Sequence, residues 1–572
     1  MTMKMNKLFS TILISAAMTP VLAQNIVDAG RFGSTEIAGT ARYRSMAGAF
    51  GALGGDATCM KDNPAGIGIF RGNSQVSISP TLAVSRSKTD GTVSQKSKKS
   101  DFSVSNLAYI ISIRPEGFDR LVNFNIGLGL NHSEGVNRKY KMTMDNPRGS
   151  FGNYVAVRAN NALRATNHFN DPGYLADDKA WEDSNIPLIA LMGYDSFAID
   201  DAGYWIGEGE DRKFVRTGGV NAYNVSEGLQ SYQRLAVREK NRMDEYDINL
   251  SANWDDTFYA GLTLSIIDYN STILSDLYED YDYQYEGDYT EYSNDLETQG
   301  SGVNVKLGVL WKATDAWRLG LAVHTPTWYE MKDYYNGAMI TNDPDCLDYS
   351  YANRNGAYEY RYKYQTPWEY QISAAYVVGT KGILSLEYDA KDFSRAKYTS
   401  ANDYKGEYSG MNRLIKNNMQ LQHTIKAGAE YRLTDNLSLR AGYAFQTSPY
   451  KDNVLNDNLG QTGWSETYRG ENYWGDDRTL MFDSSTKTNY SLLDKTQYIC
   501  GGIGWAKGNW FFDFAVMDRI QDEVVAAYPT TQSVSFDFDP NWNASFSEGV
   551  VADHVDMKTH TLKYDLTIGY KF

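Results

Sequence analysis

The sequence predicts an all-β protein: a 14-stranded antiparallel transmembrane β-barrel with an N-terminal hatch in its lumen. Fourteen segments alternate between apolar and polar residues with a period of two. The connections between them alternate strictly between short and long. This combination is typical of bacterial outer-membrane barrels, in which tight periplasmic turns alternate with large extracellular loops. A glycine-rich stretch before the first alternating segment predicts the hatch.

Residues 121–132 show the alternation most clearly. Their sequence, LVNFNIGLGLNH, places Val, Phe, Ile and Leu on one face and Asn and Gly on the other. Because successive strand residues point to opposite faces, this pattern predicts a strand with one apolar and one polar face. In a barrel the apolar face contacts lipid and the polar face lines the lumen. The fourteen segments lie near residues 75–86, 101–113, 121–132, 247–254, 258–268, 303–311, 317–324, 368–378, 382–392, 421–433, 437–446, 496–505, 510–518 and 560–572.

The long connections all fall on one side of this arrangement. A soluble sandwich, the alternative for alternating strands, would have no reason to segregate its loops in this way. An even number of strands also places both chain ends in the periplasm. One local conflict is Pro80, which cannot donate to a ladder and predicts a bulge or gap in the first strand. The long connections are 133–246, 269–302, 325–367, 447–495 and 519–559.

The chain divides into three predicted parts. Residues 1–23 have Lys4 and Lys7 before a short apolar run and end on small residues, as a cleavable secretory signal peptide does. Residues 24–74 lack the strand alternation and form the hatch, and residues 75–572 form the barrel. The chain ends on Phe572. A terminal aromatic residue on a last strand resembles the signal read by the outer-membrane assembly machinery, which is therefore an expected partner.

Composition excludes several functions. The net charge of -16 and pI of about 5.0 disfavour nucleic acid as a partner, because phosphate binding needs a basic footprint. Three widely spaced cysteines, Cys59, Cys346 and Cys500, give neither a zinc motif nor a disulfide framework. No histidine belongs to an H-E-x-x-H motif or follows a G-x-S-x-G motif. We therefore expect no enzyme, no cofactor and no metal.

The stretch GAFGALGGDATCMKDNPAGIG, residues 48–68, has two interpretations. It is rich in glycine, as phosphate-binding loops are, but it lacks G-x-x-x-x-G-K-[ST] and a preceding strand. Barrels of eight strands fill their interior with side chains, whereas much larger ones leave an aqueous channel. A fourteen-stranded barrel therefore needs a plug, and glycines permit the close backbone approach that a plug requires.

This stretch also carries a resemblance to a known family. ARYRSMAGAFGALGGDATCMKDNPAGIGIFRG, residues 41–72, resembles the hatch of FadL-type outer-membrane transporters, including Asn63-Pro64-Ala65. VHTPTWYEM at 323–331, LEYDAKDFSRAKY at 386–398 and LRAGYAFQTSPY at 439–450 resemble other segments of Bacteroidetes-type members. The resemblance implies passive uptake of hydrophobic small molecules, such as long-chain fatty acids, through a hatch-gated barrel in the outer membrane. We expect a monomer.

Three groups of residues are candidate site residues. The gating hatch comprises two glycines that permit hinging and the turn fixed by the family motif. Gly127 and Gly129 face the lumen in the third strand, which the family kinks beside a lateral opening; they either mark such an opening or make room for the plug. Inward charges near a periplasmic turn either dock the hatch or are solvated. The hatch group is Gly54, Gly55, Asp56, Asn63, Pro64 and Ala65, and the docking group is Glu430, Arg432 and Arg440.

A second function from another class stays open. The long polar loops are suited to docking, as in a barrel scaffold or docking component of an outer-membrane protein-secretion or lipopolysaccharide-modification machine. A continuous apolar pocket above the hatch would favour transport, and a polar, loop-sealed interior would favour docking. The acidic, tyrosine-rich residues 277–297 are either a solvated loop or a site for divalent cations that bridge lipopolysaccharide. Outer-membrane lipid and lipopolysaccharide are expected partners in either case.

Overall fold

The computed structural model describes residues 25–572 except for short interruptions. These are residues 73, 118, 134, 136, 184–185, 207–212, 223–230, 282–287, 343–357, 403–407, 456–487, 531, 537–543, 549 and 551. The predicted signal peptide, Cys346 and much of the predicted 447–495 loop therefore lie outside the described residues. The predicted division into signal peptide, hatch and barrel stays a prediction.

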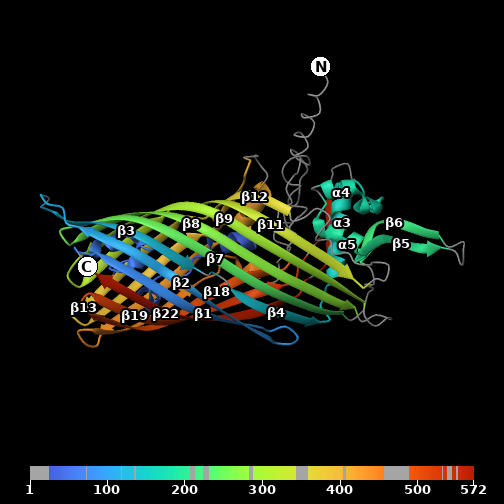
Figure 1. The fold of residues 1–572 in the computed structure, drawn as a ribbon. Coiled ribbons are helices and arrows are strands. Elements are labelled where there is room, and N and C mark those ends of the chain that lie inside the picture. The colour runs from blue at the N-terminus through green and yellow to red at the C-terminus, as the bar shows by residue number, and fades with distance from the viewer. Residues whose placement is uncertain are drawn as a thin grey trace, which may run out of the picture.

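Fourteen strands of the described chain close into one antiparallel barrel (Figure 1). Each strand pairs with the next along the chain, and the last pairs with the first, from Gln75↔Lys571 to Thr89↔Met557. The predicted barrel and all fourteen predicted segments are confirmed. The strands are β1 (Gln75–Thr89), β2 (Gln95–Ile113), β3 (Leu121–Ser133), β7 (Ser231–Trp254), β8 (Phe258–Tyr281), β9 (Asp288–Lys312), β10 (Trp317–His324), β13 (Glu369–Val378), β14 (Gly382–Asp392), β16 (Leu421–Arg432), β17 (Leu437–Gln446), β18 (Tyr490–Lys507), β19 (Trp510–Ala526) and β22 (His554–Lys571).

Four further strands prolong the barrel on the side of the long connections. β4 (Arg138–Asp145) comes after β3 in the chain and pairs with the same neighbour, β7. In the same way β11 (Trp328–Thr341) comes after β10 and pairs with β9. β12 (Tyr358–Gln365) pairs with β11, and β15 (Lys397–Ser400) pairs with β12. Pro326 and Pro367 stand at two of the breaks, where a residue without an N–H cannot continue a ladder. β8 and β9 likewise run through most of residues 269–302, a predicted long connection.

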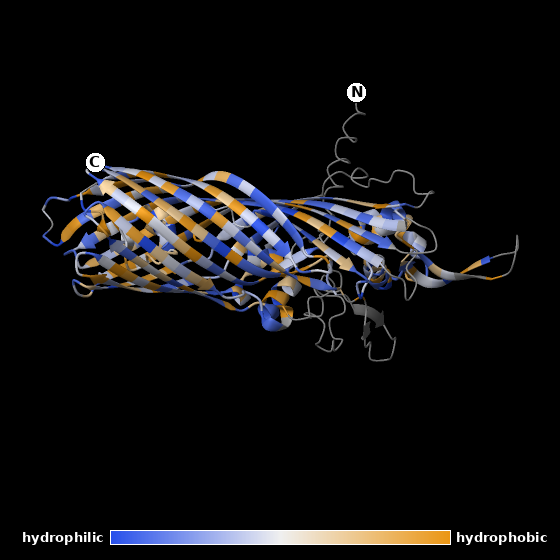
Figure 2. Cartoon of the chain, turned by 90° about the horizontal axis from the view of Figure 1, so that it is seen from below, coloured by the Kyte–Doolittle hydropathy of each residue, from blue (hydrophilic) through white to orange (hydrophobic). Residues whose placement is uncertain are grey.

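The outer face of the barrel carries an apolar belt. Along β7, Tyr246, Ile248 and Leu250 are each more than 40% exposed, while the residues between them are buried in the lumen. Figure 2 shows hydrophobic and hydrophilic residues alternating along the strands throughout the barrel. In water such a face would be unstable, so the belt is the surface that meets lipid. No helix in the described part of the chain is long and apolar enough to cross a membrane.

Pro80 lies at an irregularity in the pairing of β1, because its ring leaves no N–H group to donate to a neighbouring strand. The register of β1 against β2 shifts between Ser79 and Pro80, and Ser79 and Pro80 have no partners in β22. On the β2 side pairing continues at Pro80↔Val104 past the shift, and on the β22 side it resumes at Thr81↔Asp565. The predicted bulge is confirmed, and it is compatible with a closed barrel because the ladder is interrupted over only two residues.

A small helical unit, which we call the cap, lies at the end of the barrel far from the C-terminus (Figure 1). It is inserted between β4 and β7, within the predicted 133–246 connection. Its apolar residues share one core with the inward faces of the prolonged strands, including Leu277 of β8 and Tyr292 of β9. The elements of the cap are α3 (Phe151–Ala165), η3 (Pro172–Ala176), α4 (Asp178–Glu182), α5 (Leu188–Asp195), β5 (Ile199–Ile206) and β6 (Lys213–Ala222).

A buried carboxylate fixes the cap to the barrel. Glu279 of β8 is fully buried. Its Oε2 accepts hydrogen bonds from the backbone N–H groups of Phe151 (2.8 Å) and Gly152 (3.3 Å) at the start of α3. Its Oε1 accepts one from Gln233 of β7 (2.6 Å). A carboxylate at a helix N-terminus satisfies orphan N–H groups and is favoured by the helix dipole.

Three smaller helices and a hairpin complete the described elements. η6 (Phe393–Arg395) and α6 (Ser409–Asn418) lie between β14 and β16, and α7 (Asp452–Leu455) follows β17. β20 (Gln532–Phe536) and β21 (Ala544–Glu548) pair with each other. Helix α6 packs over the barrel end next to the first residues of the described chain, through Ile415 in a shared apolar cluster.

Replacing Glu279 by Gln should loosen the cap. The amide would remove the negative charge and could present an NH2 group to the backbone N–H groups of Phe151 and Gly152, which now donate to an oxygen. A buried charge-assisted hydrogen bond of this kind contributes about 1.5–3 kcal/mol to stability. We expect limited proteolysis within residues 146–230 to become faster. Glu330→Gln, at an exposed position of β11, is the matched control. Equal digestion rates for the two variants would contradict the role given to Glu279.

Candidate functional site

Residues 25–72, which we call the N-terminal segment, fill the lumen of the barrel. The segment contains two short α-helices, α1 (Ile26–Gly33) and α2 (Ala41–Ser45), and two 3-10 helices, η1 (Ala57–Met60) and η2 (Pro64–Ile69). Each helix starts on a side-chain cap that accepts from a backbone N–H. The caps are Asn25, Thr40, Asp56 and Asn63, in chain order. Most of the segment is buried, and its apolar side chains share clusters with side chains of the barrel wall.

The turn at Asn63-Pro64-Ala65 is seated on glycines of the barrel wall. A Cβ added to Gly261 of β8 would lie 2.3 Å from the carbonyl carbon of Pro64. One added to Gly308 of β9 would lie 2.0 Å from Oδ1 of Asn63. The Asn63 amide donates to Gly51 O (2.7 Å) and to Val309 O of β9 (3.2 Å). Backbone and motif are therefore in direct contact, with no room for a side chain on the wall.

The same close contact recurs around the barrel. Glycines of five other strands face the N-terminal segment, and at each an added Cβ would lie within 2.8 Å of it. Wide contact of this kind needs glycine because any larger residue would push the segment away from the wall. We call these residues, with Gly261 and Gly308, the glycine wall. The further members are Gly127 on β3, Gly320 on β10, Gly428 on β16, Gly442 on β17 and Gly502 on β18.

One of the two predicted lateral-opening residues, Gly127, belongs to this wall, and the other, Gly129, lies two positions along the same strand. An added Cβ at Gly127 would lie 2.5 Å from the sulfur of Met60, and one at Gly129 would lie 2.9 Å from its terminal methyl carbon. Both glycines are paired on both sides, with β2 and with β7. These contacts favour the interpretation that the glycines make room for the segment. A lateral opening stays a prediction.

The predicted hinge glycines fold back onto η2, which follows Asn63. Gly54 and Gly55 have φ of +62° and +69°, which only glycine adopts without strain. Gly55 N donates to Gly66 O at 2.9 Å, which joins this turn to η2. Asp56 accepts from the Thr40 hydroxyl at 2.8 Å and ties the turn to α2. Their role in gating stays a prediction.

The predicted docking charges behave differently from one another. Glu430 accepts from Arg42 of the N-terminal segment (3.1 Å) and from Arg440 (2.6 Å). Arg440 also pairs with Asp513 of β19. The geometry thus brings Glu430 into contact with the segment directly and Arg440 through Glu430. Arg432 has an exposed side chain near the turn. Docking by these charges stays a prediction.

Sequence reasoning missed polar residues of the wall that hold the segment elsewhere. Glu387 of β14 accepts from Gly51 N at 2.6 Å. Gln371 of β13 donates to Asp62 at 2.9 Å, and Asn123 of β3 donates to Phe70 O at 2.9 Å. The signal was present, because all three side chains fall on the polar face of their alternating strands. What alternation could not supply is the partner of each one.

Glu36 links the segment to three strands of the barrel. It pairs with Lys563 of β22 and with Arg519 of β19 (3.4 Å). It also accepts from the Ser133 hydroxyl at 2.7 Å. Burial alone would raise the pKa of Glu36, but the charges of Lys563, Arg519 and Arg44 outweigh it and hold the pKa below its usual range. Glu36 therefore stays ionised under all ordinary conditions, and its contacts persist at mildly acidic pH.

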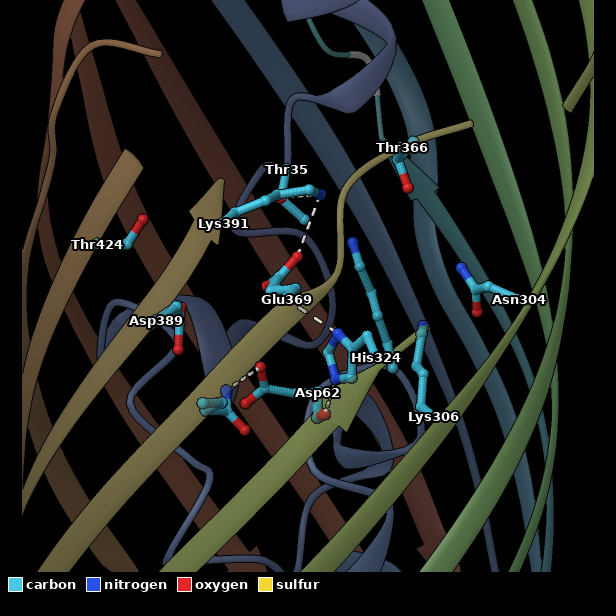
Figure 3. Close-up of polar contacts among 12 residues, drawn as sticks. Thr35, Asp62, Asn304, Lys306, His324, Thr366, Glu369, Asp389, Lys391 and Thr424 are labelled. Carbon is cyan, nitrogen blue, oxygen red and sulfur yellow. Dashed lines mark hydrogen bonds and ion pairs between the residues drawn. The ribbon is translucent and has the colours of Figure 1, made fainter. Parts of the chain in front are cut away.

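Two small cavities adjoin the N-terminal segment. The first has a volume of about 100 Å³ and is lined by charged, hydroxyl and aromatic side chains. Figure 3 shows Lys391 directed at Glu369 (3.2 Å), which lies beside His324, with Asp62 beneath. The second, of about 70 Å³, lies on the other side of residues 34–36, which line both cavities. Neither is the continuous apolar pocket that would favour transport.

The apolar part of the lumen is occupied by α1. Tyr364 of β12 donates to Ala29 O at 2.7 Å, and Tyr450 donates to Val27 O at 3.3 Å. The ring of Phe32 packs edge-on against Tyr269 and Tyr364, with centroids 5.3 and 5.4 Å apart. Aromatic rings with hydroxyls at their tips can thus hold a helix by its side chains and its carbonyls together.

The described residues suggest no metal site: they contain no group of three or more His, Cys, Asp or Glu side chains that could hold a metal ion. The candidate site is therefore the interface between the N-terminal segment and the wall. A closed antiparallel barrel with an apolar belt and an occupied lumen defines an outer-membrane β-barrel protein. Localisation to the outer membrane, predicted from the sequence, is confirmed by this fold and by the family match that follows.

Comparison with known families gives one match. Residues 281–456 match the family described as outer membrane protein transport protein (OMPP1/FadL/TodX). The match confirms the predicted resemblance to FadL-type proteins, and the segments quoted at 323–331, 386–398 and 439–450 all lie within it. It covers less than a third of the chain and does not include the N-terminal segment. The assignment to Bacteroidetes-type members stays a prediction.

Solved structures of similar shape have low sequence identity. A FadL homologue of Pseudomonas aeruginosa is 12% identical, covers 94% of this chain and 99% of its own, and gives a TM-score of 0.49. The toluene transporter TodX of P. putida is 10% identical, with coverages of 94% and 99% and a TM-score of 0.46. The toluene transporter TbuX of Ralstonia pickettii is 11% identical, with the same coverages and a TM-score of 0.44. Among curated proteins, none matches this chain. The account of the fold rests on the strand pairing.

Replacing Gly308 by Ala should unseat the N-terminal segment. The new methyl group would overlap Asn63 Oδ1, and overpacking of this kind costs about 1–3 kcal/mol. We expect trypsin to cleave the folded protein within residues 25–72 more rapidly. Gly501→Ala is the matched control, because its added Cβ would meet only Arg440 O, at 3.9 Å. Unchanged cleavage in Gly308→Ala would show that the wall does not position the segment.

Proposed function

We propose that the protein is an outer-membrane channel for the passive uptake of hydrophobic small molecules, and that the N-terminal segment is its gating hatch. The observation that carries the proposal is the glycine wall, which holds a separate segment inside a complete barrel. A fourteen-stranded barrel is too wide for its own side chains to fill, and here the lumen is filled by a segment that is not part of the barrel ladder. The family match supports the same function, and no catalytic step is part of the proposal.

The conformation is a closed one. Cavities of about 100 and 70 Å³ are far smaller than the ~300–1,000 Å³ of sites for drug-sized ligands. The N-terminal segment blocks the lumen toward the C-terminal end of the barrel, and the core of the cap fills the opposite end. A ligand can pass only if one or both of these parts move.

Movement of the segment is also what release requires. A buried chain of ~16 carbons would contribute roughly 12 kcal/mol at ~0.8 kcal/mol per methylene, which corresponds to nanomolar affinity. At ordinary association rates such a ligand would stay bound for minutes. Uptake at a useful rate therefore needs a binding site that changes shape, and a segment held by glycine contacts is separable without breaking the barrel.

The alternative function keeps one supporting observation. The first cavity is lined by Lys, Asp, Glu and His side chains and the second by Arg and Glu, and the cap seals the barrel end. A polar, sealed interior is what a docking or scaffold component of a secretion or lipopolysaccharide-modification machine would have. The family match does not favour this role. We further propose that the protein is a monomer and that assembly machinery reads Phe572, whose ring is 54% exposed.

A disulfide that fixes the hatch tests the proposal. Cys500 of β18 packs beside Ala47 of the N-terminal segment and contacts its backbone. Ala47→Cys would place a second thiol there. We expect the oxidised variant to lose most uptake of a labelled long-chain fatty acid and to regain it on reduction, because the gate would be held shut.

The control for this variant lacks one thiol. Ala47→Cys in a Cys500→Ser background carries the same substitution in the hatch but cannot form the bond, so its uptake should not respond to reductant. Mapping of the cross-linked peptide establishes the pairing. Full uptake by the cross-linked protein would rule out gating by the segment. Absence of saturable fatty-acid binding by the folded wild type would instead favour the docking role.

A further inference from the structure

The outer face of β1 and β2 turns from apolar to basic toward the end that bears the cap. On β1 the exposed belt residue Leu82 is followed, on the same face, by Arg86 and Lys88. On β2 the residues directly opposite these two are Lys98 and Lys96. All four basic side chains are exposed. Like charges placed directly across a strand pair destabilise the pair. An anion bound between the two cations of each pair would remove this repulsion.

The outer face of β7 makes the same change. Its belt ends at Tyr246, and the exposed residues that follow on the same face include Arg242, Lys240 and Arg238. Arg238 lies directly opposite Lys139 of β4. Arg138 and Glu239, the neighbours of this pair, are buried and point inward, so Lys139 and Arg238 point outward. This is a third cross-strand pair of cations.

The two groups of cations form one surface across the seam between β2 and β4. Lys99 of β2 donates to Glu239 O of β7 at 3.3 Å and to Asn137, just before β4. Lys99 therefore joins β2 to β4 and β7 at this seam. Strands β1, β2, β4 and β7 lie next to one another (Figure 1).

Acidic residues do not neutralise this surface. At its margins Lys88 pairs with Asp90 (2.7 Å), and Arg242 pairs with Asp244. Among the residues that the structure describes, no carboxylate forms an ion pair with the six cations between them, although the whole chain has a net charge of -16. We call these six the outer basic patch: Arg86, Lys96, Lys98, Lys139, Arg238 and Lys240.

The location of the patch indicates the kind of partner. It lies on the outer wall just beyond the apolar belt, on the side of the long connections, where an outer-membrane barrel meets the outer leaflet. Lipid head groups occupy the layer outside the hydrocarbon core. Clustered Lys and Arg beside a membrane attract anionic head groups, and each charge adds to the affinity. A soluble acidic protein would have no reason to require the adjoining apolar belt.

We propose that the outer basic patch is a lipid-binding site that takes the phosphate groups of anionic lipids in the outer leaflet. A phosphate between Arg86 and Lys98, and another between Lys139 and Arg238, would convert two repulsive pairs into charge-assisted hydrogen bonds. The acyl chains of the same lipid would lie along the belt on β1, β2 and β7. The site is independent of the proposed channel function, because none of its side chains faces the lumen.

The test measures binding of purified folded barrel to lipid A that carries its phosphates and to the same lipid after enzymatic dephosphorylation. We expect the phosphorylated form to bind about tenfold more tightly or better. Replacing Arg86, Lys98 and Lys240 together by Gln should remove that preference. Replacing Lys381, Lys416 and Lys507 by Gln changes the net charge equally at exposed positions outside the patch, and should leave it intact.

Three results would overturn the proposal. One is equal binding of phosphorylated and dephosphorylated lipid by the wild type. Another is an undiminished phosphate preference in the Arg86, Lys98 and Lys240 variant. The third is displacement of the lipid by millimolar inorganic phosphate, which would indicate a site for a free ion. The heat-modified gel mobility of each variant establishes that its barrel is closed.

Discussion

Direct contact between the backbone of the N-terminal segment and the glycine wall is the constraint on which the rest of the structure depends. At Gly308 and Gly261 the wall approaches Asn63-Pro64 so closely that no Cβ could fit. Contacts this short fix the position of the segment, and with it the place of Asp62 beside Gln371 and of Glu36 beside Lys563. They also account for the small size of the two cavities, about 100 and 70 Å³, that adjoin the segment. Glycine weakens a strand that carries it. The concentration of glycines at this interface therefore indicates that they are there to let the N-terminal segment fit inside the barrel.

Charge is distributed unevenly across the barrel wall. Inward-facing charges occur in compensated groups, such as Lys426 with Glu387 (2.7 Å) and Asp389 (2.8 Å). Breaking such a buried pair is costly because an uncompensated charge remains, so these groups favour one seated position of the segment over many. The outer basic patch has the opposite character, because Arg86 stands opposite Lys98 and Lys139 stands opposite Arg238 with no ion-paired carboxylate among the described residues. The lumen therefore supplies its own counter-charges, and the proposed lipid site would supply those of the patch.

The barrel was predictable from the sequence because its determinants are local. Alternation along one strand tells which face meets lipid, and connection lengths tell which end is extracellular. The bulge at Pro80 was predictable because proline has no N–H group to donate to the ladder. The contacts of the site were not predictable, because each joins residues far apart in the chain, such as Gly51 with Glu387. Alternation placed Glu430 in the lumen but could not show that it meets Arg42. Strand ends were underestimated where β8 and β9 continue as polar, tyrosine-rich sequence that reads as a loop.

The central claim is that the N-terminal segment separates from the glycine wall when ligand passes. Cys59 reports on this movement because it is a free thiol that is fully buried in the apolar cluster shared by the segment and the wall. In a Cys346→Ser, Cys500→Ser protein, the rate of Cys59 labelling by a small thiol reagent should rise when a long-chain fatty acid is bound. A labelling rate that stays unchanged at saturating ligand would contradict the account, since the ligand would then bind and leave without moving the segment.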